Sequence, residues 1–172
     1  STDGDGFKQA YGKMLEDKHI HIAVVLGAGP AARAVVQALN EMGISTFAYA
    51  RPGKNYDLAS SVFHGCTAHL SLFTPDSAGT ATVFVNATSE HCSVLHESLT
   101  SQALSEYAAF IDINVGDTAM AHAARGNTPI VHDGLRMAVA QSLLQFELWT
   151  GIMLGDHAQE LENMVELLQK AQ

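Results

Sequence analysis

The sequence predicts an α/β fold with a doubly wound, mainly parallel six-stranded sheet and helices on both of its faces. Short apolar runs alternate with helical stretches along the chain, as in sheets whose strands are joined by helical crossovers. The first clear strand runs directly into a glycine-rich turn that opens a helix. With 47% apolar residues among 172, the chain can bury a core of ordinary size.

The expected strands are short, apolar and rich in β-branched residues. The first of them, residues 21–26 (HIAVVL), is a continuous apolar run that ends at a glycine, as a buried parallel strand should. The other five are expected at residues 46–50, 67–71, 82–86, 109–113 and 130–131.

Helices are expected between these strands. One begins near Phe7, and another covers residues 30–42 and stops at Gly43. Three more are expected later in the chain, at residues 54–63, 117–125 and 135–149. A terminal helix at residues 156–170 carries an apolar stripe, so it is expected to pack back on a neighbouring domain or helix; the stripe contains Leu161, Met164, Val165 and Leu168.

The turn after the first strand has the spacing Gly27-x-Gly29-x-x-Ala32, followed by a helix. This is the Rossmann dinucleotide fingerprint in its expected context. A pyrophosphate would accept hydrogen bonds from the free amides at the helix start, and Pro30 suits a first helical position. A tight turn without a ligand is the alternative. The predicted cofactor-binding residues are Gly27, Ala28, Gly29, Pro30 and Ala31.

The residues after the second strand favour NADP over NAD. NAD sites usually carry an acidic residue there, whereas a 2′-phosphate needs positive charge. Here Arg51 and Lys54 follow the strand, and no acid precedes Asp57. Arg51 and Lys54 are therefore the predicted 2′-phosphate ligands. The alternative is that they are solvated surface charges.

Composition excludes several other functions. The formal net charge is −9 and there is no basic run, so nucleic acid is not an expected partner. No apolar stretch reaches the length of a membrane span. The nine histidines and the cysteines Cys66 and Cys92 show no ligand spacing, so no metal site is expected. The cysteines fit reduced thiols in a cytoplasmic protein.

Four further segments extend the pattern beyond the glycine turn. The chain opens with TDGDGF at residues 2–7 and continues with NATS at residues 86–89. It closes with GLRMAVAQ at residues 134–141 and FELWTG at residues 146–151. In this order and spacing the chain resembles the C-terminal two-thirds of a shikimate dehydrogenase. The resemblance implies NADP-dependent reduction of 3-dehydroshikimate to shikimate.

The resemblance also implies roles for single residues. Asp3 would be catalytic, contacting substrate hydroxyls and pairing with a catalytic lysine, and Gln141 would contact substrate. Taken alone, Asp3 is more simply explained as a helix cap, Gln141 as a water-facing residue and Met137 as a core residue. The resemblance adds five cofactor-binding residues, namely Asn86, Thr88, Ile113, Gly134 and Met137.

The chain also departs from the family. The family's N-terminal domain, which supplies the catalytic lysine and a pair of serines, is not part of residues 1–172. We therefore expect these residues to be the NADP-binding domain, to turn over shikimate very poorly, and to expose an apolar wall that promotes self-association, for example as a homodimer.

Other departures cast doubt on shikimate itself. Val115 stands where the family has a substrate-contacting tyrosine, Ser1 stands where it has asparagine, and Glu90-His91-Cys92 replaces a Gly-Met pair. These changes resemble divergent shikimate dehydrogenase-like paralogues. Two alternatives therefore stay open: a paralogue acting on quinate or another hydroxy acid, and a non-catalytic nucleotide-binding domain.

Overall fold

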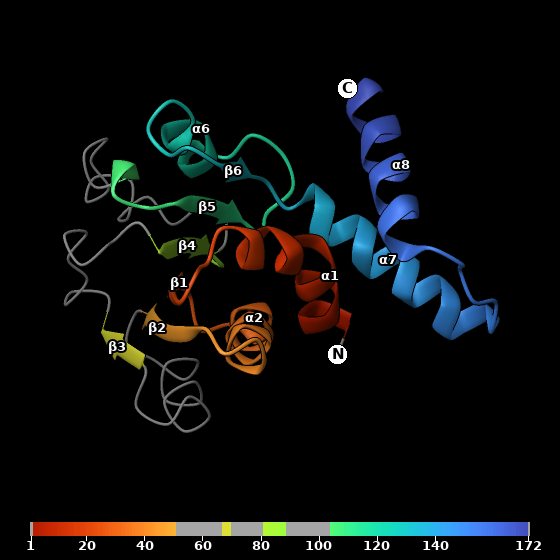
Figure 1. Ribbon diagram of the computed structural model, residues 1–172, viewed down its shortest axis with the longest axis horizontal. Coiled ribbons are helices and arrows are strands. Elements are labelled where there is room, and N and C mark those ends of the chain that lie inside the picture. Colours follow the sequence, from red (N-terminus) through yellow and green to blue (C-terminus); the bar gives the residue numbers. More distant parts are fainter. Residues whose placement is uncertain (1, 51–66, 70–80, 89–103, 172) are drawn as a thin grey trace.

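Parallel strands form a sheet in the order β3-β2-β1-β4-β5-β6 (Figure 1). The computed structural model describes residues 2–50, 67–69, 81–88 and 104–171. The chain leaves β1 on one side to form β2 and β3 and returns on the other side to form β4, which places a switch point between β1 and β4. The predicted α/β class with a parallel sheet is confirmed. The strands are β1 (Ile22–Leu26), β2 (Ser45–Ala50), β3 (Thr67–His69), β4 (Thr82–Asn86), β5 (Ala109–Asp112) and β6 (Val131–His132).

Four of the described helices have bounds within two residues of those expected. They are α2 (Pro30–Glu41), α6 (Ala119–Ala124), α7 (Leu135–Thr150) and α8 (His157–Lys170). α6 begins later than expected because Thr118 caps it, its Oγ1 accepting a hydrogen bond from Ala121 N at 3.0 Å. The expected helix at residues 54–63 lies outside the described residues.

The first helix, α1 (Thr2–Asp17), begins earlier than near Phe7, so this expectation was wrong. Asp3 and Asp5 lie inside its first turn, and neither caps a helix that starts after them. Packing explains the early start, because Gly4 approaches α2 and Gly6 approaches α7. These contacts are distant in sequence, and local capping signals do not report them.

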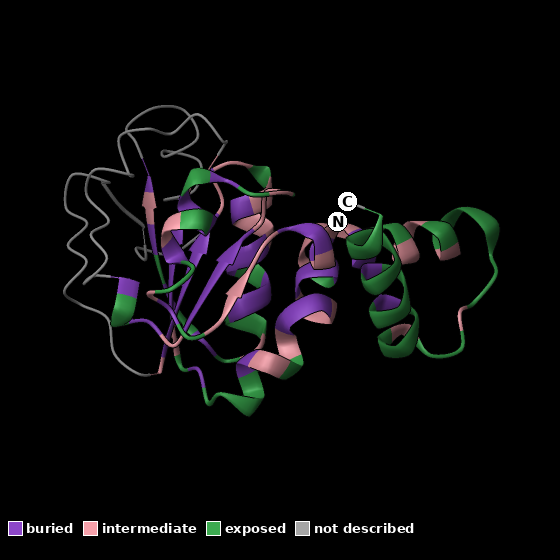
Figure 2. Ribbon diagram, turned by 90° about the horizontal axis from the view of Figure 1, so that it is seen from above, coloured by how far each residue is buried: buried purple, intermediate pink, exposed green. Residues whose placement is uncertain are grey.

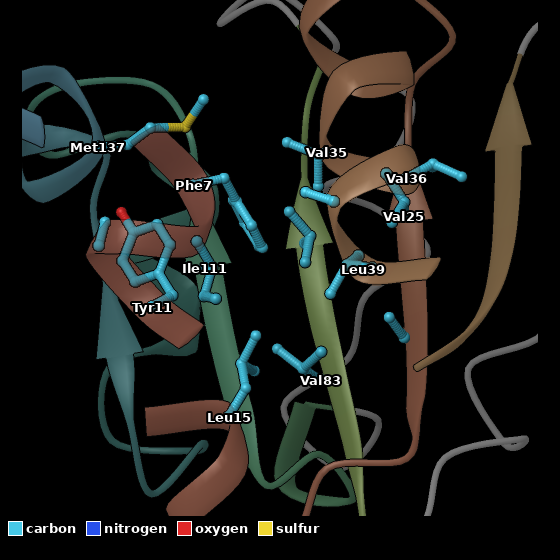
Figure 3. Packing of buried hydrophobic residues seen from close by; sticks show 14 of the residues in the cluster. Phe7, Tyr11, Leu15, Val25, Val35, Val36, Leu39, Val83, Ile111 and Met137 are labelled. Atoms are coloured by element: carbon cyan, nitrogen blue, oxygen red, sulfur yellow. The ribbon is translucent and has the colours of Figure 1, made fainter. Parts of the chain in front are cut away.

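Alternating strand residues divide the core between the two faces of the sheet. One face holds Val25, Val83 and Ile111, which pack against α1, α2 and α7 (Figure 3). From α1 come Phe7, Tyr11 and Leu15, and from α2 come Val35, Val36 and Leu39. The other face is covered by α6 and the segment before β5; its cluster contains Val24, Leu26, Phe84, Leu104, Tyr107, Phe110 and Met120.

Helix α1 lies between α2 and α7 and joins the sheet to the C-terminal helices (Figure 1). The Tyr11 hydroxyl donates a hydrogen bond to Asp133 O at 2.8 Å, and burial raises the pKa of Tyr11. This bond fixes α1 against the segment that enters α7. α1 therefore carries the opening motif of the chain to the closing motif on α7.

Helix α8 packs on α7 through Leu161 and Val165 and extends beyond the sheet (Figure 2). Arg136 of α7 forms a two-pronged ion pair with Glu162 of α8, which lowers the pKa of the Glu162 carboxyl. The outer half of this helical hairpin is exposed (Figure 2). Within the described ranges, no helix combines the length and apolarity that crossing a bilayer requires.

Candidate functional site

The segments singled out by the sequence meet at the carboxyl edge of the sheet. The turn after β1, the end of β4 and the end of β5 lie side by side, because β1 pairs with β4 and β4 with β5 in parallel register. The start of α7 joins them through a hydrogen bond from Gly134 N to Asn114 O at 2.8 Å. Ligands of doubly wound sheets bind at this edge, next to the switch point.

The glycine turn leaves the start of α2 open. Gly29 is the residue preceding the helix, and within the described part of the chain no side chain caps it. Among the described residues, no atom lies within 4 Å of the position that a β-carbon on Gly29 would take. Pro30 is exposed and Ala31 is partly exposed. Amides at the start of a helix need partners, and an anion in the open space beside Gly29 would supply them.

Gly27 brings the turn against the end of β4. Its φ of +121° lies in a region that side chains disfavour. A β-carbon there would lie 2.9 Å from the carbonyl carbon of Ala87 and closer still to the carbonyl oxygen. Gly27 N also donates a hydrogen bond to Tyr49 O of β2 at 2.9 Å. Gly27 therefore holds three strand ends together.

Arg33, in the first turn of α2, contacts the glycine turn and was not among the predicted site residues. Its Nη1 donates a hydrogen bond to Ala28 O at 2.9 Å, which places a cation on the first turn of α2. The bond also engages a backbone carbonyl of the turn, next to the expected anion. The signal was available, because an arginine near a glycine loop is notable in a chain of net charge −9.

The predicted residues of β4 and β5 are linked by hydrogen bonds. Asn86 is 3% exposed, and its Nδ2 donates to Asp112 Oδ2 at 3.0 Å. The Thr88 hydroxyl donates to Asn86 Oδ1 at 2.7 Å. Ile113 is partly exposed, so its side chain is available at the edge. Asp112 was not among the predicted site residues; its signal was an acid ending an apolar strand.

The start of α7 presses directly on the end of β5. A β-carbon on Gly134 would lie 2.5 Å from the carbonyl carbon of Ile113 and 2.7 Å from that of Asn114. Gly134 therefore sits against the expected nicotinamide side. Met137 is 4% exposed and belongs to the core, so little of its side chain is accessible to a ligand.

Asp3 and Gln141, which are 138 positions apart, form a hydrogen bond. Gln141 Nε2 donates to Asp3 Oδ1 at 2.6 Å, so this glutamine does not simply face water. Gly6 permits the pairing, because a β-carbon there would lie 2.6 Å from Gln141 Cγ. The glycines of the opening motif therefore have a packing reason, which sequence reasoning missed.

Several predicted residues lie outside the described ranges. They are Arg51 and Lys54, for which the structure gives no geometry, and the departures Ser1, Glu90, His91 and Cys92. Val115, which replaces the family's tyrosine, is 54% exposed. Among the residues that the structure does describe, no group of three or more His, Cys, Asp or Glu side chains could hold a metal ion.

The parallel sheet, its switch point and the open glycine turn define a domain of the Rossmann class. No protein-family model matches the chain. Solved structures with this fold include a chorismate mutase/shikimate 5-dehydrogenase fusion protein from Clostridium acetobutylicum, with a TM-score of 0.76 and 22% identity. The match covers 99% of this chain and 62% of that one.

Two other solved structures were determined with ligands. Quinate dehydrogenase from Corynebacterium glutamicum, in complex with NAD, has a TM-score of 0.73 at 22% identity, and the match covers 96% of this chain and 62% of that one. Shikimate 5-dehydrogenase from Thermus thermophilus, in complex with shikimate, has a TM-score of 0.67 at 27% identity, with the same coverage.

Within the Rossmann class, curated relatives point to one family. A shikimate dehydrogenase (NADP(+)) of Bacillus cereus is 30% identical over 165 residues, which cover 88% of this chain and 58% of that protein. That of Rhizobium meliloti is 29% identical over 161 residues, covering 88% and 55%. The chain is thus a relative of the shikimate dehydrogenases, and the resemblance seen in the sequence is confirmed. It spans less than two thirds of their length.

Proposed function

We propose that this chain is the NADP-binding part of a shikimate dehydrogenase-type oxidoreductase, which reduces 3-dehydroshikimate to shikimate. The hydrogen bond between Asp3 and Gln141 carries this proposal. The resemblance assigns substrate contacts to these two residues, and the fold brings them together from opposite ends of the chain. The names of the curated relatives support NADP as the cofactor.

The described residues fit a bound dinucleotide. The open space at Gly29 and the uncapped start of α2 would hold the diphosphate, and the carboxyl edge at Ile113 and Gly134 would face the nicotinamide. When bound, the cofactor supplies a hydride. Asp3 and Gln141 would orient the substrate hydroxyls, while the lysine that handles the proton would come from an N-terminal substrate domain outside these 172 residues.

A paralogue acting on quinate or another hydroxy acid is the second candidate. Val115 favours it, because an exposed valine cannot supply the hydroxyl of the family's tyrosine. The fold shared with a quinate dehydrogenase is consistent with it. Turnover of quinate by a full-length protein, with little turnover of shikimate, would favour this candidate. A non-catalytic nucleotide-binding domain would bind NADP⁺ and turn over neither substrate.

Titration calorimetry with NADP⁺ and NAD⁺ tests the cofactor assignment. We expect NADP⁺ to bind more tightly, and Arg51→Ala to weaken NADP⁺ about tenfold to a hundredfold, since a hydrogen bond to a charged group contributes roughly 1.5–3 kcal/mol. The affinity for NAD⁺, which lacks the 2′-phosphate, should stay unchanged. Lys13→Ala, on an exposed part of α1, is the control. Unchanged NADP⁺ affinity in Arg51→Ala would reject the phosphate assignment.

We also propose that the chain self-associates through the outer surface of the α7–α8 hairpin. This surface contains Leu148 (73% exposed), Trp149 (80%) and Met153 (76%), three large apolar side chains close together in sequence, and exposed apolar patches mark interaction sites. The occupant we propose is a second copy of the chain. We further propose a cytoplasmic location, because Cys66 and Cys92 fit reduced thiols.

Sedimentation velocity over a range of concentrations tests the self-association. We expect the average mass to rise with concentration, and Trp149→Glu to shift the population towards monomer because it places a charge in the apolar surface. Lys13→Gln, at an exposed position of α1, should have no effect. A strictly monomeric profile at high concentration would contradict the proposal.

A further inference from the structure

The carboxylate of Asp112 is fully buried at the end of β5 and accepts four hydrogen bonds. Oδ1 accepts from N and Nδ2 of Asn114 at 3.0 and 2.7 Å. Oδ2 accepts from Asn86 Nδ2 at 3.0 Å and from Thr118 Oγ1 at 2.6 Å. Asp112 is 0% exposed. A buried carboxylate is tolerated when neighbouring donors satisfy it, so the donors and the charge hold one another in place.

The same side chains close a ring between β4 and β5. Asn114 Nδ2 also donates to Thr88 O at 2.9 Å. Thr88 N and Oγ1 both donate to Asn86 Oδ1, at 3.1 and 2.7 Å. Asn86 in turn donates to Asp112, which completes the circuit. We call these four residues, Asn86, Thr88, Asp112 and Asn114, the Asp112 ring.

The ring is bonded to the two residues, Ile113 and Gly134, that form the proposed nicotinamide side of the site. Ile113 N donates to Asn86 O at 3.0 Å, and Gly134 N donates to Asn114 O at 2.8 Å. The backbone of both residues is thus fixed to members of the ring. The adenosine side is built on other elements, namely the start of α2 and the end of β2. Disturbing the ring should therefore affect one half of a dinucleotide more than the other.

We propose that Asp112 is a positioning residue for the nicotinamide half of the dinucleotide. It acts through the ring, because its buried side chain cannot touch a ligand. The carboxylate holds the ends of β4 and β5 at the spacing that Ile113 and Gly134 need. The inference rests on the proposed function, since it assumes that a dinucleotide binds at this edge.

The test compares NADP⁺ with adenosine 2′,5′-bisphosphate, a probe that carries the adenosine half alone. Calorimetry on the full chain is run for wild type and for Asp112→Asn. In Asp112→Asn, the new amide donor faces other donors on whichever side it lies, Asn86 on one side or Asn114 on the other, and an unpaired buried donor has a substantial cost. We expect NADP⁺ affinity to fall about tenfold and affinity for the bisphosphate to stay within about twofold. Asp117→Asn, an exposed acid of the same loop paired with Arg125, is the control.

A double variant provides the rescue. Combining Asp112→Asn with Asn86→Asp exchanges donor and acceptor between residues 86 and 112, so each of the four ring residues keeps a partner, although the Thr118 hydroxyl loses the acceptor that Asp112 Oδ2 provides. We expect it to regain most of the NADP⁺ affinity, and it carries the test if Asp112→Asn alone does not fold. An equal loss for both probes in Asp112→Asn, no loss, or no recovery in the double variant would overturn the positioning role.

The wild-type titration separates this inference from the function on which it rests. If the wild type binds neither probe, the proposed function fails, and this inference fails with it. If the wild type binds both probes with equal affinity, the nicotinamide half is not held, and the role of Asp112 alone is overturned.

Discussion

Gly27→Ala is expected to lower the free energy of unfolding by about 2–6 kcal/mol. The residue has a φ of +121°, which alanine adopts at a cost, and its β-carbon would overlap the Ala87 carbonyl. The Ala87 atoms that the new β-carbon would meet belong to the backbone, so no flexible side chain can move aside to relieve the overlap. Urea unfolding followed by circular dichroism measures the effect. A midpoint equal to that of the wild type would show that the turn and β4 are not held at this distance.

Gly29→Ala is the matched control, two residues along the same turn. Gly29 has an extended backbone, with φ of −68° and ψ of 176°, and nothing in the described part of the chain lies within 4 Å of its β-carbon position. Its stability should therefore stay within about 1 kcal/mol of the wild type. The added methyl group would occupy the space proposed for the diphosphate. A stable Gly29→Ala variant with weakened NADP⁺ binding would separate the two glycines, one needed for the fold and one for the ligand.

The parts of the fold that could be predicted from the sequence depend on neighbouring residues. The run HIAVVL before Gly27 predicted β1, because a strand buried on both faces is apolar at every position. The turn and helix that follow carry their own stop and start signals. For the same reason, the α/β class and the order of the elements followed from one sequence.

The features that could not be predicted depend on contacts between residues that are distant in the sequence. The early start of α1 depends on Gly4 meeting Ala34 and Gly6 meeting Gln141, which no local pattern records. The Asp112 ring joins residues 26 positions apart, and a lone buried aspartate in the sequence does not identify its donors. The hydrogen bond between Asp3 and Gln141 was not predicted either, because the resemblance implied a substrate contact for each residue and not a contact between them.

Gly134→Ala is expected to destabilise the chain by about 3 kcal/mol or more, although its φ of −73° suits alanine. The whole effect should come from overlap with the backbone of Ile113 and Asn114. Either α7 must move away from β5 or the end of β5 must shift, and the hydrogen bond from Gly134 N to Asn114 O opposes both. Differential scanning calorimetry should show a fall in Tm of about 2–4 °C for each kcal/mol.

Gly151→Ala separates overlap from backbone strain in this comparison. Gly151 ends α7 with a φ of +71°, and no atom of the residues that the structure describes lies within 4 Å of its β-carbon position, so alanine there costs about 1–2 kcal/mol of strain alone. If Gly134→Ala lowers the free energy of unfolding no more than Gly151→Ala does, then α7 does not lie that close to β5. If it costs more and also weakens NADP⁺ but not adenosine 2′,5′-bisphosphate, the contact between α7 and β5 sets the geometry of the nicotinamide side, as the Asp112 ring requires.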